Sequence, residues 1–125
     1  TGCTQVLEFL SNVQDELLLV LCLNDRSADG TDVSWIWDAE FELLESFGDR
    51  LRGVVVSGDR AAEMRLRVKY AGVPQERISE QRDYGRLVEE LGAQSVPVFI
   101  MPTYTAMLDL RRVLIRQCGG AEFWE

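Results

Sequence analysis

Four aspartates follow a short apolar segment near the start of the chain, and their carboxylates could serve a catalytic, ligand or partner site. The apolar segment covers residues 17–23 and is bounded by turn-forming residues, which is typical of a buried strand. The polar segment behind it carries Asp25, Asp29, Asp32 and Asp38. In open α/β sheets the ligand crevice lies beyond the carboxyl ends of the strands, so a site is expected here. Loop solvation and helix capping would explain the same acids.

Asp32 and Asp38 allow two interpretations each. An aspartate that orients the histidine of a nucleophile–base pair is held rigidly at a loop or helix start and points outward, and Asp32 fits this description. Alternatively, Asp32 or Ser34 caps a helix predicted from about residue 35 to residue 47, which Gly48 ends. Asp38 would then lie in the first turn, where the helix dipole favours a carboxylate. The residues alone leave these interpretations open.

Two further junctions place a helix start behind a strand. Gly58 and Arg60 follow the strand predicted over residues 52–56, and free N–H groups at such a helix start can bind an anion, aided by the Arg60 guanidinium. Thr103 and Tyr104 follow a later strand in the same way, with Thr103 as a helix cap and Tyr104 over the sheet edge. Well-packed turns are the simpler interpretation, because neither a dinucleotide fingerprint nor a P-loop motif occurs.

Trp35 and Trp37 flank one residue, so they point in different directions on a helix. We expect one ring to pack on the sheet and the other to be exposed or to face a partner, where a tryptophan is a frequent anchor. The arginines and lysine of the helix predicted over residues 60–70, Arg67 among them, are expected on its solvated face.

Composition excludes several classes of function. Thirteen basic against 21 acidic residues give a net charge of −8, which argues against a nucleic-acid partner. The chain has no histidine, so it cannot complete a Cys-His or Ser-His pair by itself. Cys3, Cys22 and Cys118 are widely spaced, which favours reduced thiols over a metal site. No stretch approaches the roughly 18 apolar residues of a membrane span, so we expect no embedded segment.

Helical and strand patterns alternate along residues 1–125, which predicts a single α/β domain with a Rossmann-like, mostly parallel sheet flanked by helices. In chain order we expect a helix over about residues 4–12, a strand over 17–23, a helix over 35–47, a strand over 52–56, a helix over 60–70, an edge strand near 77–79, a helix over 83–91, a strand over 96–101 and a helix over 104–118. Because the pattern opens on a helix, we expect the first strand of the sheet to lie upstream, in a longer parent chain.

Five segments together resemble the C-terminal domain of MurT-type subunits of lipid II isoglutaminyl synthase, relatives of the Mur ligases. The most specific is the block from Asn24 to Asp38, N-D-x-x-A-D-G-x-D-x-S-W-I-W-D. The others are weaker singly but follow in the family's order, at residues 57–60, 67–72 and 102–108, with Thr1-Gly2 similar to the end of an N-P-x-G motif. The resemblance implies a Mur ligase C-terminal type of fold.

The resemblance also implies a function. The family amidates the D-glutamate of the lipid II stem peptide to D-isoglutamine in an ATP-dependent reaction, in the cytoplasm at the inner face of the membrane. Its partner is a GatD-type glutaminase that carries the nucleophilic cysteine and a histidine and releases ammonia from glutamine. The C-terminal domain docks this partner and contributes an aspartate to the Cys-His pair, a role that falls on Asp32 by motif position, with Asp38 as the fallback. Trp35 and Trp37 are the expected partner contacts.

The chain also departs from the whole family pattern. The ATP-binding loop and the Cys-rich zinc-binding insertion have no counterpart here, so ATP, Mg²⁺ and zinc are expected upstream, and this domain should neither hold a cofactor or metal nor catalyse alone. Two alternatives remain. One is a freestanding Rossmann-like module that binds a phosphorylated ligand at the helix starts of residues 58–60 and 102–104. The other is an enzyme using Asp32 and Asp38 as acid and base. The residues that could face a ligand at this edge are Asp25, Asp29, Arg60, Thr103 and Tyr104.

Overall fold

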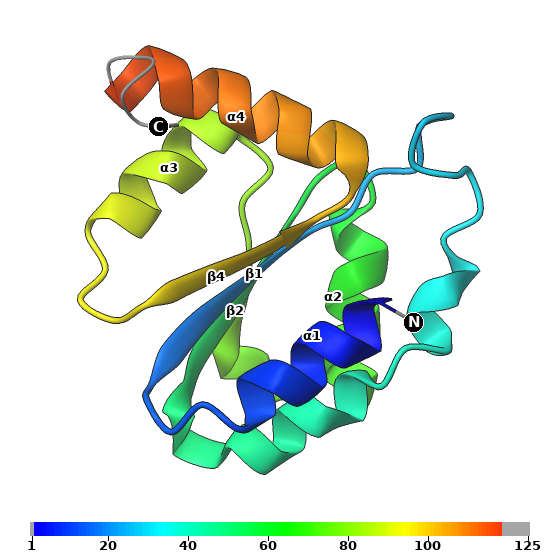
Figure 1. Ribbon diagram of the computed structural model, residues 1–125, viewed down its shortest axis with the longest axis vertical. Coiled ribbons are helices and arrows are strands. Elements are labelled where there is room, and N and C mark those ends of the chain that lie inside the picture. The colour runs from blue at the N-terminus through cyan, green and yellow to red at the C-terminus, as the bar shows by residue number, and fades with distance from the viewer. Residues whose placement is uncertain (1, 119–125) are drawn as a thin grey trace.

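Four apolar segments of the chain form a parallel sheet with helices on both faces (Figure 1). The computed structural model describes residues 2–118. Over these residues the elements are α1 (Gly2–Ser11), β1 (Leu17–Cys22), the 3₁₀ helices η1 (Ser34–Trp37) and η2 (Phe41–Arg50), β2 (Leu51–Ser57), α2 (Ala61–Tyr70), the 3₁₀ turn η3 (Gln75–Arg77), β3 (Ile78–Glu80), α3 (Tyr84–Gly92), β4 (Val98–Pro102) and α4 (Tyr104–Cys118).

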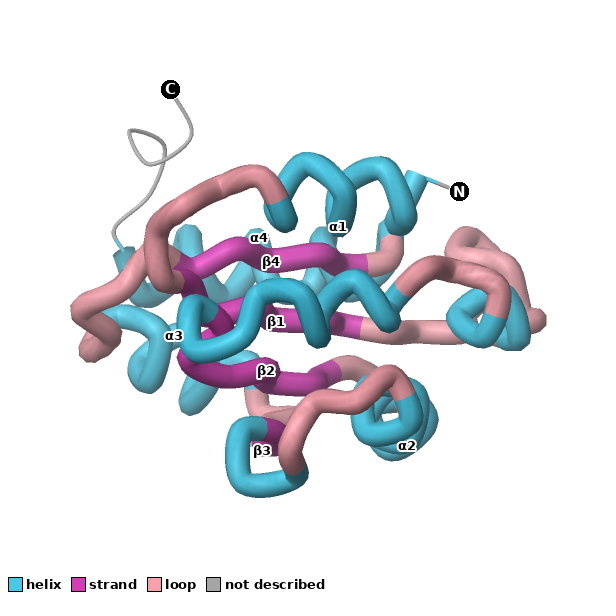
Figure 2. The backbone as a smooth tube through the Cα atoms, turned by 90° about the horizontal axis from the view of Figure 1, so that it is seen from below, coloured by secondary structure: helices cyan, strands magenta, loops and turns pink. Residues whose placement is uncertain are grey.

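The strands lie side by side in the order β3-β2-β1-β4, and each pair is parallel (Figure 2). The chain therefore builds the sheet outward from β1 through β2 to β3, and then returns to add β4 on the other side of β1. The change of direction creates a topological switch point between β1 and β4, the usual place for a ligand crevice in this class of sheet. This arrangement confirms the predicted α/β, Rossmann-like class, with β3 as an edge strand.

Alternation along β1 divides the core into two layers. Leu17, Leu19 and Leu21 face one side and pack with α1, η1, η2 and α2, whereas Leu18 and Val20 face the other side and pack with α3 and α4. All six residues of β1 are buried, because helices cover both faces of a central parallel strand. The continuous apolar run that predicted this strand is a direct consequence.

The prediction of a continuous helix over residues 35–47 is wrong. The segment instead forms η1 and η2, separated by a break at residues 38–40. The guanidinium of Arg67 explains the break, since its Nε donates to the carbonyl of Ile36 at 2.6 Å and its Nη2 to that of Ala39 at 2.8 Å. These two carbonyls bond to a side chain from α2 rather than to amides one turn farther along.

The same contacts correct the expected position of Arg67, which is 2% exposed rather than solvated. Its guanidinium also makes a two-pronged ion pair with Glu42, with N–O distances of 2.8 and 2.9 Å. A planar guanidinium can satisfy two carbonyls and a carboxylate together, which a lysine could not do. Arg67 thus joins α2 to both 3₁₀ helices.

Replacing Arg67 by Ala should lower the free energy of unfolding by about 3 kcal/mol or more, because two backbone carbonyls and the Glu42 carboxylate lose their partner. Urea denaturation of the domain would measure the change. The matched control is Arg65→Ala on the same helix, since Arg65 is exposed and, within residues 2–118, its ion pair is the one with Glu80 at 4.0 Å. This control should cost less than about 1 kcal/mol. Equal losses for both variants would contradict the structural role of Arg67.

Candidate functional site

The carboxyl ends of β1, β2 and β4 meet around the side chain of Asn24, which is buried. Its backbone N–H donates to Thr103 Oγ1 at 3.0 Å and its Nδ2 to Thr105 Oγ1 at 2.9 Å, while its Oδ1 accepts from the backbone N–H of Asp59 at 2.7 Å. One side chain therefore connects the loops that follow three strands. This role of Asn24 is not predicted from the sequence, although a polar amide directly after a buried strand is a signal for it.

Asp29 lies in the same network and closes it. Its Oδ1 accepts from the backbone N–H of Thr105 at 2.7 Å, and its Oδ2 accepts from the Thr105 hydroxyl and from the backbone N–H of Arg26. Partial burial opposes the charged form, but these hydrogen bonds outweigh it and lower the pKa of Asp29. The carboxylate thus serves as a cap for the first turn of α4, supplied from a distant loop.

The ionised groups at this edge are largely paired with one another. Arg60 bonds Asp25 at 2.5 Å and also pairs with Glu63, and Arg26 bridges Asp59 and Asp109, each at 2.9 Å. The Arg60 guanidinium is therefore shared between two carboxylates. An anionic ligand would have to displace them and would meet the surrounding negative charge.

The amides at the two helix starts are engaged as well. The N–H groups of Asp59 and Arg60 donate to Asn24 Oδ1 and to the carbonyl of Leu23, and that of Thr105 donates to Asp29. Gly58 adopts a φ of +92°, and a Cβ there would lie 2.4 Å from the Leu23 carbonyl oxygen. The turn is thus packed against backbone, and the geometry gives the phosphorylated-ligand alternative no support.

Thr103 and Tyr104 take different positions. The Thr103 hydroxyl accepts from the Asn24 amide and belongs to the network, whereas the Tyr104 ring is exposed on the first turn of α4. The structure therefore places Asp25, Asp29, Arg60 and Thr103 at one edge, where each is bonded to other groups of the protein. Asp32 and Asp38 lie apart from them, along the segment around η1.

Asp32 is exposed and held at the start of η1. Its Oδ1 accepts from the backbone N–H of Ser34 at 2.9 Å, an Asx-type contact between residues two apart. Hydrogen bonds from the backbone and the side chain of Ser34 lower the pKa of Asp32. The carboxylate is consequently ionised, oriented and open to solvent, although the N-cap position of η1 belongs to Val33.

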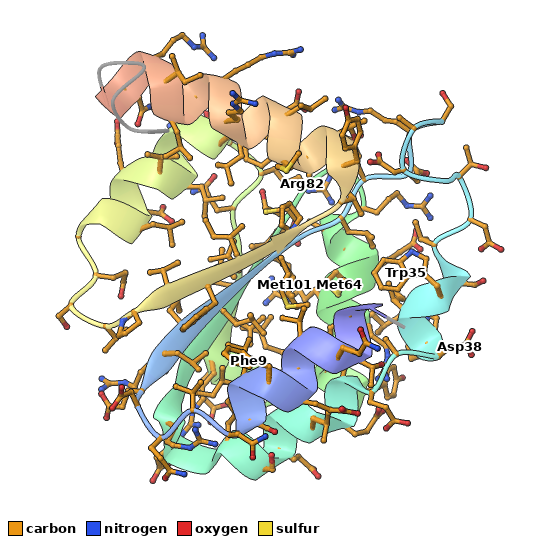
Figure 3. The ribbon with its side chains drawn as sticks, viewed as in Figure 1. Phe9, Trp35, Asp38, Met64, Arg82 and Met101 are labelled. Carbon is orange, nitrogen blue, oxygen red and sulfur yellow. The ribbon has the colours of Figure 1, made fainter. Side chains whose placement is uncertain are left out.

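Asp38 occupies the other end of the element. It follows η1 as its C-cap, where its N–H donates to the Trp35 carbonyl, and its side chain is exposed at the outer edge of the molecule (Figure 3). The expectation that Asp38 lies in the first turn of a helix is therefore wrong. The two aspartates therefore lie at opposite ends of η1, and the carboxylate of Asp32 is oriented by the backbone N–H of Ser34.

The two tryptophans separate as expected. Trp35 packs against the core toward Met64 and borders an apolar cavity of about 600 Å³ between α1 and β4 (Figure 3). Trp37 is 48% exposed, and its ring centroid lies 6.1 Å from that of Tyr70. Trp35 is thus largely a core residue, and Trp37 presents the accessible ring.

Of the three cysteines, Cys3 and Cys22 have described side chains, whereas that of Cys118 lies outside the described part of the chain. Burial raises the pKa of Cys22 to about 12 and that of Cys3 to about 11, which keeps both thiols protonated. Within these residues no three His, Cys, Asp or Glu side chains are grouped so as to hold a metal ion. The helices in this range are also too short or too polar to cross a membrane.

Substituting Asp29 by Ala should lower the free energy of unfolding at pH 7 by about 1–2 kcal/mol, because α4 loses its cap and the Arg26 amide its acceptor. The folded-state pKa is depressed, so this stabilisation is present above the unfolded pKa of about 3.9 and is lost as the pH falls through the lower folded value. Urea denaturation at several pH values should show the difference from wild type shrinking below about pH 4. Asp38→Ala is the control, and a pH-independent difference for Asp29→Ala would exclude a role for its charge.

Comparison with known proteins identifies a family with which the α/β fold is consistent. A family model described as MurT ligase C-terminal matches residues 1–107. A Streptococcus pneumoniae relative, the subunit MurT of lipid II isoglutaminyl synthase (glutamine-hydrolyzing), is 33% identical over 114 residues, which cover 90% of this chain and 25% of the relative. Subunits of the same name from Staphylococcus aureus strains COL and N315 are 33% identical over 121 residues, covering 97% of this chain and 27% of each relative. The chain thus spans about a quarter of the length of these relatives, and it belongs to the MurT ligase C-terminal family.

Proposed function

We propose that this chain is the C-terminal domain of a longer ligase subunit that amidates the D-glutamate of lipid II to D-isoglutamine with ammonia from glutamine. In this proposal the domain docks a GatD-type glutaminase subunit and supplies Asp32 to its Cys-His pair. The relatives are named as glutamine-hydrolysing synthase subunits, which supports a role within a complex. The substrate places the complex in the cytoplasm, at the inner face of the membrane.

The observation that carries the proposal is the state of Asp32. Its carboxylate is ionised, exposed and oriented by Ser34, and it lies outside the network that binds the other acids of the loop. A chain without histidine has no internal use for such a carboxylate in a nucleophile–base pair. A histidine supplied by a partner would complete the arrangement.

The mechanism follows from the role of the third member of a triad. The Asp32 carboxylate accepts the Nδ1–H of the partner's histidine and holds the imidazole with Nε2 toward the cysteine thiol. When the histidine takes the thiol proton, the negative carboxylate stabilises the imidazolium. The cysteine thiolate then attacks the carboxamide carbon of glutamine, and the leaving ammonia takes its proton from the histidine. Because the pKa of Asp32 is lowered, the carboxylate stays charged throughout.

The ligase step belongs elsewhere in the subunit. ATP with Mg²⁺ would supply the phosphoryl group that activates the glutamate carboxylate. In this domain, the backbone N–H groups of Asp59, Arg60 and Thr105, which lie at the helix starts where a phosphate could bind, already donate to Asn24, Leu23 and Asp29. We therefore assign ATP and Mg²⁺ to an upstream domain and zinc to an upstream insertion. On this assignment, the isolated domain is catalytically inactive.

Glutaminase turnover of the full ligase subunit reconstituted with its glutaminase tests the triad. Asp32→Asn should reduce turnover by roughly 10²-fold or more, since the corresponding change in a Ser-His-Asp triad costs about 10⁴ in kcat. Size-exclusion chromatography would verify that the complex still forms. The isosteric control is Asp38→Asn, which should retain turnover. Unchanged turnover for Asp32→Asn in an intact complex would refute the triad, and a collapse for Asp38→Asn alone would transfer the role to Asp38.

A further inference from the structure

An exposed apolar patch lies where η1 meets α2. It consists of Trp37, Tyr70 and Leu66, which are 48%, 66% and 44% exposed. The rings of Trp37 and Tyr70 are in contact at an interplanar angle of 51°, and Leu66 lies one turn before Tyr70 on the same stripe of α2. Exposed apolar side chains gathered in this way are typical of an interaction surface, whereas scattered ones are not.

The Trp37 ring is held in place by a contact with the guanidinium of Arg67. The Arg67 guanidinium lies 5.2 Å from its centroid, in the position of a cation–π contact. This guanidinium is itself fixed by hydrogen bonds to the carbonyls of Ile36 and Ala39 and by its ion pair with Glu42. The exposed ring therefore loses little freedom when a partner covers it, which favours tight binding. Tryptophan and tyrosine are also the residues most often found at interface hot spots.

The patch is continuous with the proposed catalytic contact. Asp32 bonds Ser34 at the first residue of η1, and Trp37 is the last residue of the same element. Four residues of 3₁₀ helix span about 8 Å. An interface of standard size buries about 800 Å² on each partner, equivalent to a disc of roughly 16 Å radius. An interface of this size centred on η1 therefore includes both Asp32 and Trp37.

Charge around η1 restricts the chemistry of the partner. Asp32, Asp38, Glu40 and Glu42 are exposed along this side of the patch. Lys69, beside Tyr70 on α2, is a basic exception. A second copy of this chain, with its own net charge of −8, would meet this acidic rim with like charge, whereas a partner with Arg or Lys at its edge would be complementary.

We propose that the Trp37–Tyr70 patch is the anchor by which this domain docks its glutaminase partner, and that the partner presents a basic edge to the acidic rim of η1. The inference rests on the proposed function and deepens it by assigning the docking surface. In this arrangement the patch provides the binding affinity for the glutaminase, and Asp32 orients the histidine of the glutaminase.

The test is the dissociation constant of the full ligase subunit for its glutaminase, measured by isothermal titration calorimetry. Trp37→Ala should weaken binding by about 30-fold or more, as expected for a hot-spot residue, and Tyr70→Ala by a smaller factor. Trp37→Phe keeps an aromatic ring and should recover part of the affinity. The control is Phe9→Ala, because Phe9 is 67% exposed on α1, well away from the end of η1 marked by Asp38 (Figure 3); it should change the constant less than twofold.

Three further measurements make the result decisive. Circular dichroism verifies that each variant is folded, and raising the salt concentration should slow association of the wild type. At saturating glutaminase, Trp37→Ala should regain nearly full glutaminase turnover, because docking and not chemistry is impaired. A turnover defect that persists at saturation with an unchanged dissociation constant would overturn the docking role.

Failure of the inference and failure of the proposed function are distinguishable. If the wild-type subunit does not bind the glutaminase at all, the proposed function falls. If wild type and Trp37→Ala bind it equally, only the patch assignment falls, and the Asp32→Asn experiment still decides the triad. If Trp37→Ala abolishes self-association of the subunit and leaves glutaminase binding unchanged, the occupant is a second copy and the proposal is wrong.

Discussion

The three hydrogen bonds of the buried Asn24 side chain and backbone amide determine how the carboxyl edge of the sheet is built. They join the ends of β1, β2 and β4, which are far apart in the sequence. A buried amide without partners would be costly, so the loops that satisfy it are constrained to one arrangement. The carboxylate of Asp29 then fastens the same loop to α4. The path of the chain toward η1 is fixed by these contacts.

Arg67 constrains the other end of the segment that runs from Asn24 to Ala39. Asn24 and Asp29 hold this segment where it leaves β1, and Arg67 holds it between η1 and η2. Between them the backbone carries no long regular helix, yet both of its ends are bonded to buried or partly buried groups. Asp32 is therefore exposed without being loosely placed. A rigid support at both ends is what a residue that must meet a partner's side chain requires.

The sequence predicts those helices and strands that are determined by the pattern of apolar residues within the element itself. Continuous apolar runs located β1, β2 and β4, and helical spacing located α2, α3 and α4, because burial on both faces of a sheet and on one face of a helix leaves those patterns. The helix over residues 35–47 failed because a guanidinium from α2 takes two of its carbonyls. The roles of Asn24, Asp29 and Arg67 depend on contacts between segments that are far apart in the sequence. The spacing of residues along the chain therefore does not predict these roles.

The switch point between β1 and β4 is where this class of sheet usually holds a ligand. Here an apolar cavity of about 600 Å³ borders the ends of these two strands, whereas the polar groups at the edge are largely bonded to one another. Its helix-start amides donate to Asn24 and Asp29, and its arginines pair with carboxylates. The exposed carboxylate of Asp32 and the accessible ring of Trp37 lie around η1, one loop away. The bonded loops at this edge form a rigid scaffold for the segment that follows β1. In the proposed function, the chemistry takes place at Asp32, on a segment that a second protein can reach.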